Sequence, residues 1–141
     1  MFRIASMMEL SIIIPVYNAE NTIVKCLDSL ANQSISQKYY EVICIDDGSF
    51  DNSFATLTAY NDIKNFITFT QPNSGPARAR NNGVEKARGN ILLFTDSDCI
   101  LDYYWIHEMT KPFDESDVFG VQGRYKTKQK QIVSQFEQIE I

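Results

Sequence analysis

The sequence predicts an α/β fold in which helices cover both faces of a mostly parallel sheet. Short apolar, β-branched runs alternate with segments whose apolar residues recur at helical spacing, from Leu10 to Thr95. Two of these runs end in acidic residues, Asp46-Asp47 and Asp96-Ser97-Asp98. Right-handed crossovers in such a β-α-β-α-β-α-β order place the strands side by side, with helices above and below them. The acidic residues then gather at the carboxyl ends of the strands, where open α/β sheets bind ligands.

The first half of the chain predicts a β-α-β unit. The run Leu10–Val16 is apolar and β-branched, so we expect the first strand there. An amphipathic helix is expected over Ala19–Gln33, because its apolar residues fall at helical spacing: Ile23, Cys26, Leu27 and Leu30. The second strand is expected over Glu41–Ile45, and it leads directly into the first acidic pair.

A second helix should follow the second strand. Asp51 or Asn52 can cap it, and it should run to about Tyr60 with Phe54 and Leu57 facing inward.

The next segment predicts a third strand, a third helix and a fourth strand. The third strand is expected over Asn65–Thr70. Pro76 suits the first turn of a helix that should run to about Ala87, and Gly89 ends it. The fourth strand, Ile91–Thr95, contains four consecutive apolar residues, a pattern typical of a strand buried on both faces.

Beyond the fourth strand the pattern is weaker. We expect a helix over Asp102–Lys111, an edge strand over Val118–Gly123, a polar basic patch over Lys126–Lys130 and a helix over Gln131–Ile141. The last helix stops without a cap. We therefore expect residues 1–141 to form the N-terminal part of one domain, truncated at its C-terminus.

Composition excludes several classes of protein. The chain has 141 residues, 44% of them hydrophobic, and a net charge of −5, which argues against a nucleic-acid-binding surface. No apolar run approaches the roughly 18–20 residues of a membrane span, and Met1–Leu10 is too short and polar for a secretory signal. The three cysteines, Cys26, Cys44 and Cys99, form no CxxC pair and are interpreted as core residues in a reducing cytoplasm.

Asp96 and Asp98 are the first candidate site residues. Two carboxylates one residue apart after a buried strand are costly if dry and unpaired. They suit a divalent cation, which takes oxygen ligands and often shares them with a nucleotide diphosphate. The alternative is a solvated loop in which Asp98 or Asp102 caps the next helix.

The segment Asp46-Asp47-Gly48-Ser49 is open to two interpretations. These residue types favour a turn that caps a helix. A carboxylate at a strand end can equally accept a hydrogen bond from a base imide or a ribose hydroxyl, and Gly48 lets a ligand approach the backbone.

The segment Asn73–Gly83 combines a helix N-terminus with two arginines. A helix N-terminus suits a diphosphate, and Arg78 and Arg80 add charge-assisted donors. They lie two residues apart and face different sides of a helix, so only one should reach a ligand; a surface ion pair is the alternative for either. The single histidine, His107, is interpreted as a surface or packing residue, which excludes catalytic schemes based on histidine.

Together these segments resemble the family 2 glycosyltransferases of the GT-A fold. The motifs that carry the resemblance occur in the family's order and spacing: Ser11-Ile-Ile-Ile-Pro15-Val-Tyr17-Asn18, Ile45-Asp46-Asp47-Gly48-Ser49-Phe-Asp51, Asn73-Ser-Gly75, Ala79-Arg80-Asn81-Asn-Gly83, Ala87-Arg-Gly89 and Phe94-Thr-Asp96-Ser-Asp98. The resemblance implies a Rossmann-like three-layer sandwich, a nucleotide-diphosphate sugar as donor, a Mn²⁺ or Mg²⁺ ion, and inversion at the anomeric carbon.

The resemblance also implies roles for particular residues. The nucleoside pocket would be lined by Pro15, Tyr17 and Glu20. Asp47 would meet the base with Asp46 beside it, Arg80 would lie near the base or the diphosphate, and Asp96 would approach the ribose or the metal. Asp98 would be the metal ligand. Cys99 stands where the family more often has a second acidic residue.

The acceptor side is not recognisable in this chain. The family's general base is a carboxylate well beyond the metal motif, and no acidic residue after Asp98 matches it: Glu115, Asp117, Glu137 and Glu140 all lie outside the expected motif. The resemblance implies a saccharide or lipid-linked acceptor, cell-surface polysaccharide synthesis, and a cytoplasmic location that includes the inner face of the membrane. It favours a UDP-sugar as donor.

Four other classes compete with this interpretation. Aspartate-nucleophile phosphatases carry their DxD near the N-terminus, receiver domains need a lysine at a later strand end, and dinucleotide oxidoreductases show GxGxxG where this chain has Pro15-Val-Tyr-Asn. The fourth alternative is a non-catalytic nucleotide-sugar-binding chain or a subunit that needs a partner.

Overall fold

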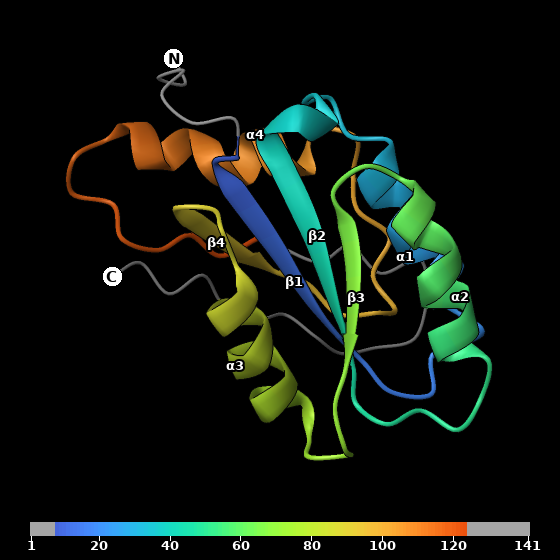
Figure 1. Cartoon of the computed structure of the whole chain (residues 1–141). Coiled ribbons are helices and arrows are strands. Elements are labelled where there is room, and N and C mark those ends of the chain that lie inside the picture. Colours follow the sequence, from blue (N-terminus) through green and yellow to red (C-terminus); the bar gives the residue numbers. More distant parts are fainter. Residues whose placement is uncertain (1–7, 124–141) are drawn as a thin grey trace, which may run out of the picture.

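The computed structural model describes residues 8–123 and shows one sheet of four parallel strands (Figure 1). The strands lie in the order β3-β2-β1-β4. Their bounds are β1 Leu10–Val16, β2 Tyr40–Asp46, β3 Phe66–Thr70 and β4 Ile91–Phe94. Leu10 of β1 pairs with Tyr40 on one side and with Ile91 on the other, so β1 is a central strand. The predicted parallel sheet is confirmed.

Helices cover both faces of this sheet. The α-helices are α1 Ile23–Ala31, α2 Ser53–Ala59, α3 Pro76–Lys86 and α4 Trp105–Thr110, and the 3-10 turns are η1 Gln37–Tyr39, η2 Tyr60–Asp62 and η3 Lys111–Asp114. Figure 1 shows α3 on one side of the sheet and α1 with α2 on the other. The result is the three-layer arrangement that the β-α alternation predicts.

The core has two parts because side chains alternate along each strand. On one face, even-numbered residues of β1 and β2, among them Ile12 and Val42, pack with α1 and with Ile106 of α4. On the other face Ile43, Ile45 and Ala79 form a second cluster beneath α3. Both central strands are therefore buried on both faces.

The strand β4 is not buried on both faces, contrary to the prediction. It forms one edge of the sheet within residues 8–123, and only Leu93 of its four residues is buried. Phe94 is 45% exposed. The physical reason is that α3 packs on β1 and β2 and leaves its side of β4 uncovered.

Two helices begin later than predicted. The helix α1 begins at Ile23 instead of Ala19, because Asn18 has a left-handed backbone (φ 47°) and the Ala19 N–H is bound to the Ser53 side chain. The helix α4 begins at Trp105 instead of Asp102. Asp102 precedes it, and its carboxylate accepts the Tyr104 N–H at 2.9 Å.

Two further expectations were wrong within the described residues. No strand forms over Val118–Gly123, where Phe119 is 94% exposed and the sequence offers no alternation that would bury one face. Phe54 of α2 is 41% exposed and does not face the core, whereas Leu57 does. The basic patch Lys126–Lys130 and the helix Gln131–Ile141 lie outside the described residues. No helix in the described part of the chain is long and apolar enough to cross a lipid bilayer.

A polar cluster around the buried Glu41 joins the amino ends of the strands. Glu41 is fully buried, and its carboxylate accepts hydrogen bonds from Ser11 Oγ (2.6 Å), from the Arg88 N–H (2.8 Å) and from Arg88 Nε (2.8 Å). The Gly89 N–H donates to Ser11 Oγ at 2.9 Å, and a Cβ at Gly89 would lie 2.5 Å from the Leu10 carbonyl carbon. The segment Ala87-Arg88-Gly89 therefore has a structural role, at the end of the sheet opposite the acidic residues.

Candidate functional site

The acidic residues lie at the carboxyl ends of parallel strands, as predicted. Asp46 ends β2 and Asp47 follows it, while Asp96 and Asp98 follow β4. The strand between them, β1, ends in the loop that carries Tyr17 and Glu20. Because all strands run in the same direction, these loops share one edge of the sheet.

Hydrogen bonds join the loop after β1 to the loop after β2. The Asn18 N–H donates to Ser49 Oγ (2.9 Å), and the Phe50 N–H donates back to Asn18 Oδ1 (3.0 Å). The Ala19 N–H donates to Ser53 Oγ at 2.7 Å. The two loops are thus held as one unit before any ligand binds.

Glu20 also connects the loop after β1 to the loop after β2. Its carboxylate accepts the Asn52 N–H at 3.1 Å, and its own N–H donates to Asp51 at 3.2 Å. Although desolvation raises the pKa of Asp51, hydrogen bonds from Ser53 and from the Glu20 N–H outweigh it and lower the pKa below its ordinary value. The structure gives Glu20 a role at the start of α2, and its contact with a nucleoside stays a prediction.

Tyr17 presents an open aromatic surface beside these loops. Its side chain is 48% exposed and packs edge-to-face against Phe50, with ring centroids 6.1 Å apart. Phe50 is 83% exposed. Pro15 is half-buried within β1, where it pairs with Ile45. Sequence reasoning missed Phe50, whose only signal is a large apolar residue between polar ones in a turn.

Asp47 is buried, and protein groups occupy both oxygens of its carboxylate. Oδ1 accepts from the Ser74 N–H (2.7 Å) and from Gln71 Nε2 (2.8 Å), and Oδ2 accepts from the Gly75 N–H (2.9 Å). Burial on its own raises the pKa of Asp47, but these hydrogen bonds stabilise the ionised form and hold the pKa below its usual value. Asp47 thereby fixes the entry to α3, where Gly75 has a φ of 92°. Gln71 was not predicted.

Asp46 differs from its neighbour because half of its carboxylate lacks a partner. The residue is 2% exposed, and Oδ2 accepts the Ser49 N–H at 3.3 Å and the Thr70 hydroxyl at 3.5 Å. Oδ1 is the one buried side-chain oxygen or nitrogen without a hydrogen bond within residues 8–123. A buried polar atom of this kind is costly unless a ligand or a proton satisfies it.

Arg80 reaches the loop that follows β4. Its guanidinium forms an ion pair with Asp96, with Nη2 and Oδ1 2.8 Å apart, and both side chains are partly exposed. Arg78, two residues earlier, is exposed to solvent. The helix α3 turns its small residues Ala79 and Gly83 to the sheet, which leaves Arg80 beside the acidic loop.

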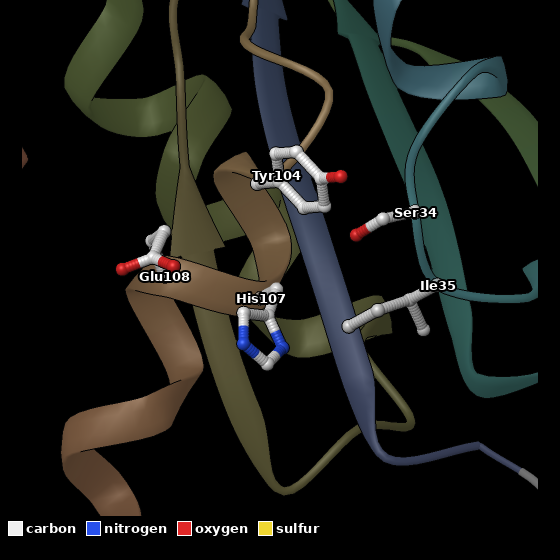
Figure 2. Close-up of a pocket in the computed structure, with 5 residues that line it drawn as sticks. All are labelled: Ser34, Ile35, Tyr104, His107 and Glu108. Carbon is white, nitrogen blue, oxygen red and sulfur yellow. The ribbon is translucent and has the colours of Figure 1, made fainter.

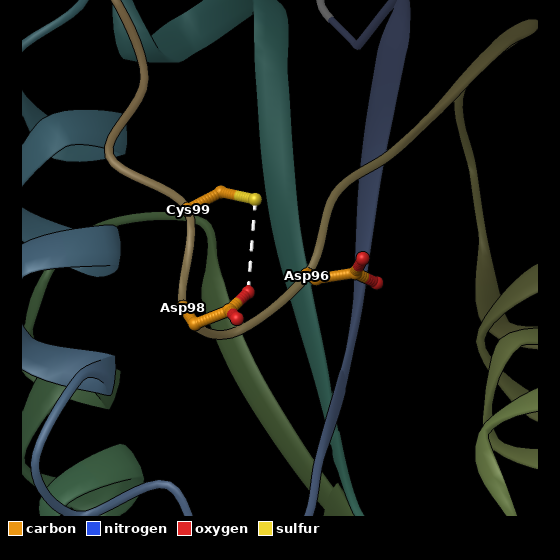
Figure 3. Close-up of side chains that lie close together, drawn as sticks. All are labelled: Asp96, Asp98 and Cys99. Carbon is orange, nitrogen blue, oxygen red and sulfur yellow. Dashed lines mark hydrogen bonds between the residues drawn. The ribbon is translucent and has the colours of Figure 1, made fainter. Parts of the chain in front are cut away.

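Asp96, Asp98 and Cys99 form a candidate metal-binding cluster (Figure 3). One ligand atom from each residue lies within 4.8 Å of the others, and the Cys99 thiol donates to Asp98 Oδ1 at 3.8 Å. Two exposed carboxylates and a thiol fit a divalent cation, since carboxylates suit Mg²⁺ and Mn²⁺.

A separate hollow lies between the segment that follows α1 and the start of α4 (Figure 2). Its volume is about 450 Å³, and its lining residues are Ser34, Ile35, Tyr104, His107 and Glu108. None of the predicted site residues lines it. The exposed His107 confirms the interpretation of this residue as a surface residue.

Comparison with known proteins identifies the family that the chain resembles. The profile of the family described as "Glycosyl transferase family 2" matches residues 11–138. The chain is 44% identical over 94 residues to the poly(ribitol-phosphate) beta-glucosyltransferase of Bacillus spizizenii, covering 64% of this chain and 15% of that protein. It is 35% identical over 127 residues to the poly(ribitol-phosphate) beta-N-acetylglucosaminyltransferase TarS of Staphylococcus aureus, covering 84% of this chain and 22% of TarS.

A solved structure supports the same relationship. The structure of S. aureus TarS in complex with UDP matches with a TM-score of 0.70 at 30% identity, covering 75% of this chain and 32% of that one. The chain thus spans 15% and 22% of the length of these two relatives and 32% of the TarS chain in the solved structure.

Proposed function

The chain belongs to glycosyltransferase family 2 and has the GT-A fold, and from this premise we propose that it binds the sugar donor of an inverting glycosyltransferase. The donor is a nucleotide-diphosphate sugar, with UDP-sugars favoured, and the acceptor is a hydroxyl group of a saccharide or lipid-linked acceptor in cell-surface polymer synthesis. The matched TarS structure contains UDP, and two relatives are named as transferases that act on poly(ribitol-phosphate).

The observation that carries this proposal is the gathering of acidic loops at the carboxyl edge of the sheet. Tyr17, with Pro15 and Glu20 in its segment, offers the surface for the nucleoside. We expect Asp47 and Asp46 to meet the base, because Asp46 ends β2, Asp47 follows it and both are buried. Arg80 and Asp96 form the side of the site that faces the ribose and the diphosphate.

Asp98, with Asp96 and Cys99 beside it, would hold a Mn²⁺ or Mg²⁺ ion. The donor set fits such an ion because two of its three groups are exposed carboxylates. When bound, the ion acts as a Lewis acid that neutralises charge on the departing nucleoside diphosphate. The guanidinium of Arg80 adds a second positive charge near the same loop. These groups orient the donor so that its anomeric carbon is open to attack from the opposite side.

We also place this chain in the cytoplasm, at the inner face of the membrane where lipid-linked acceptors are found. Its three cysteines are free, and two of them are buried in the core, which is compatible with a reducing compartment.

Calorimetric titration of the chain with UDP, GDP and dTDP, each with Mn²⁺ and with EDTA, tests the proposal. We expect UDP to bind with Mn²⁺ and much more weakly with EDTA, because the cation joins the carboxylates to the diphosphate. Equal binding of all three nucleotides would contradict base recognition by Asp46 and Asp47. No binding of any nucleotide would contradict the donor site in this chain. Slow hydrolysis of the UDP-sugar would separate a catalytic role from binding alone.

A further inference from the structure

The loop that carries Asp98 is attached to α1 at both of its ends. At the first end, the Asp96 carbonyl accepts the Cys26 thiol proton at 3.6 Å and the Cys99 N–H at 3.1 Å. At the second end, the Leu101 N–H donates to Ser29 Oγ at 3.0 Å. The Asp98 carboxylate therefore lies on a short loop whose two ends are fixed to one helix.

The Ser29 hydroxyl both donates and accepts a hydrogen bond. It donates to the Cys26 carbonyl of its own helix at 2.6 Å, which orients the oxygen. The lone pairs then face outward and accept the Leu101 N–H. A hydroxyl oriented by its own helix in this way is a preorganised acceptor.

Gln33, just beyond the end of α1, joins this helix to Asp102 and to α4. Its side-chain amide donates to the carbonyls of Ser29 (3.0 Å) and Asp102 (2.8 Å) and accepts the Ile106 N–H at 3.0 Å. It is only 8% exposed. Cys26 and Ser29 lie about one turn apart on the same face of α1, and Gln33 follows two residues after the end of the helix.

We propose that Ser29 is a positioning residue for the candidate metal loop, supported by Cys26 and Gln33. This inference rests on the proposed function of Asp96 and Asp98. The two carboxylates are exposed, and without attachment their loop would lose conformational entropy when it closes on a metal and a diphosphate. Groups that hydrogen-bond directly to metal ligands contribute roughly 10–100-fold to metal affinity, and for a group that fixes the ligand loop we expect the lower end of that range.

Three variants test this role. Ser29→Ala removes the acceptor for Leu101 while placing a better helix former in α1. Ser29→Thr keeps the hydroxyl. Thr58→Ala in α2 is the matched control, because the Thr58 hydroxyl donates to the carbonyl of Ala55 at 2.9 Å in the same way and lies exposed near the C-terminal end of α2. Each variant is measured by amide exchange without ligand and by calorimetry with UDP and Mn²⁺.

In Ser29→Ala we expect the Leu101 amide to exchange roughly tenfold faster, with exchange in β1 and β2 unchanged. We expect Mn²⁺-dependent UDP affinity to fall roughly tenfold, and Ser29→Thr to restore most of both. Thr58→Ala should change neither quantity.

Unchanged Leu101 exchange in Ser29→Ala would overturn the inference, whatever the chain binds. Faster exchange with unchanged UDP–Mn²⁺ affinity would also overturn it, since the attachment would then be structural only. If wild-type chain binds no nucleotide, the proposed function fails on its own. In that case the binding of Mn²⁺ alone is measured from the broadening of the Asp96–Cys99 amide signals. Mn²⁺ binding that is equal in wild type and Ser29→Ala would then overturn the inference.

Discussion

At the scale of single residues, Asp98 is the side chain on which metal-dependent binding should depend most. Its carboxylate is exposed and its protein partner is the Cys99 thiol at 3.8 Å, a weak donor. Asp98→Asn removes one negative charge and little packing, so we expect the fold to be unchanged. UDP affinity with Mn²⁺ should fall to the value measured in EDTA, as followed by calorimetry. Asp62→Asn, an exposed acid in η2, controls for the change in net charge. Unchanged affinity in Asp98→Asn would remove this residue from the site.

Asp47 should matter for stability as well as for binding. Asp47→Asn leaves the N–H groups of Ser74 and Gly75 facing an amide that cannot accept from all of them, and we expect a loss of about 1–2 kcal/mol in unfolding free energy. The effect depends on pH in a defined direction. Because the folded state lowers the pKa of Asp47, its stabilisation is present above the ordinary value of 3.8 and is lost as the pH falls below it.

Urea unfolding of wild type and Asp47→Asn at pH 7 and near pH 3 measures this dependence. The difference between the two proteins should be largest at pH 7 and should shrink in acid. A difference that stays constant, or grows in acid, would show that the ionised carboxylate does not hold the loop before α3.

The candidate site could be predicted in outline but not in its contacts. Strand-end acids and motif spacing indicate Asp46, Asp47, Asp96 and Asp98, and the structure places all four at one edge of the sheet. Sequence spacing cannot indicate that Arg80 pairs with Asp96, since that contact depends on how α3 packs. Gln71, Ser29 and Gln33 were missed for the same reason, because their partners lie on segments distant in sequence.

At the scale of elements, the packing of α3 on β1 depends on Gly83. A Cβ at this position would lie 2.4 Å from Cγ2 of Ile13, so a methyl group forces α3 away from the sheet. Alanine gains about 1 kcal/mol in helix propensity, but overpacking of a tight core contact costs about 1–3 kcal/mol. We therefore expect Gly83→Ala to be destabilising in thermal and urea unfolding.

A substitution of Ile13 identifies the cause of the destabilisation expected in Gly83→Ala. Ile13→Ala removes the clashing Cγ2, so the double variant should be more stable than the sum of the two single effects predicts. Glu85→Ala, exposed on the same helix, should not destabilise the protein. Additive effects in the double variant would place the strain elsewhere.

Element types were easier to predict than burial. The strands β1 and β2 follow from apolar runs, and Pro76 with Ala87 bracket α3 correctly to within a residue. The same apolar pattern misled the interpretation of β4, because a run such as Ile91–Phe94 does not reveal whether a helix covers its second face. The start of α1 was missed because the N–H groups of Asn18 and Ala19 donate to Ser49 and Ser53, which are distant in sequence, and hold the preceding residues in a non-helical conformation.

At the scale of the whole molecule, the two ends of the sheet differ in how completely their polar groups are satisfied. The amino ends are joined by the buried Glu41 and Ser11 together with the exposed Arg88, and every oxygen of the Glu41 carboxylate has a partner. The carboxyl ends carry exposed or incompletely satisfied acids, among them Asp46 and Asp98. Substitution of an exposed acid such as Asp98 can therefore alter binding without altering stability, whereas the buried Asp47 at the same edge affects both.

This division predicts where a bound nucleotide slows amide exchange. With UDP and Mn²⁺ present at about 100 times the dissociation constant, every amide that exchanges by global unfolding slows roughly 100-fold, so the location must come from amides that open locally. Among these we expect slowing in the loops after β1, β2 and β4, over residues 17–20, 47–50 and 95–99.

The hollow lined by Tyr104 and His107 offers an alternative location of about 450 Å³. Local slowing at residues 103–108 without slowing at 95–99 would place the nucleotide there and would contradict the carboxyl-edge site. Because Gln33 connects α4 to the same helix that holds the metal loop, weak slowing at Ile106 that accompanies strong slowing at 95–99 is expected and supports the carboxyl edge.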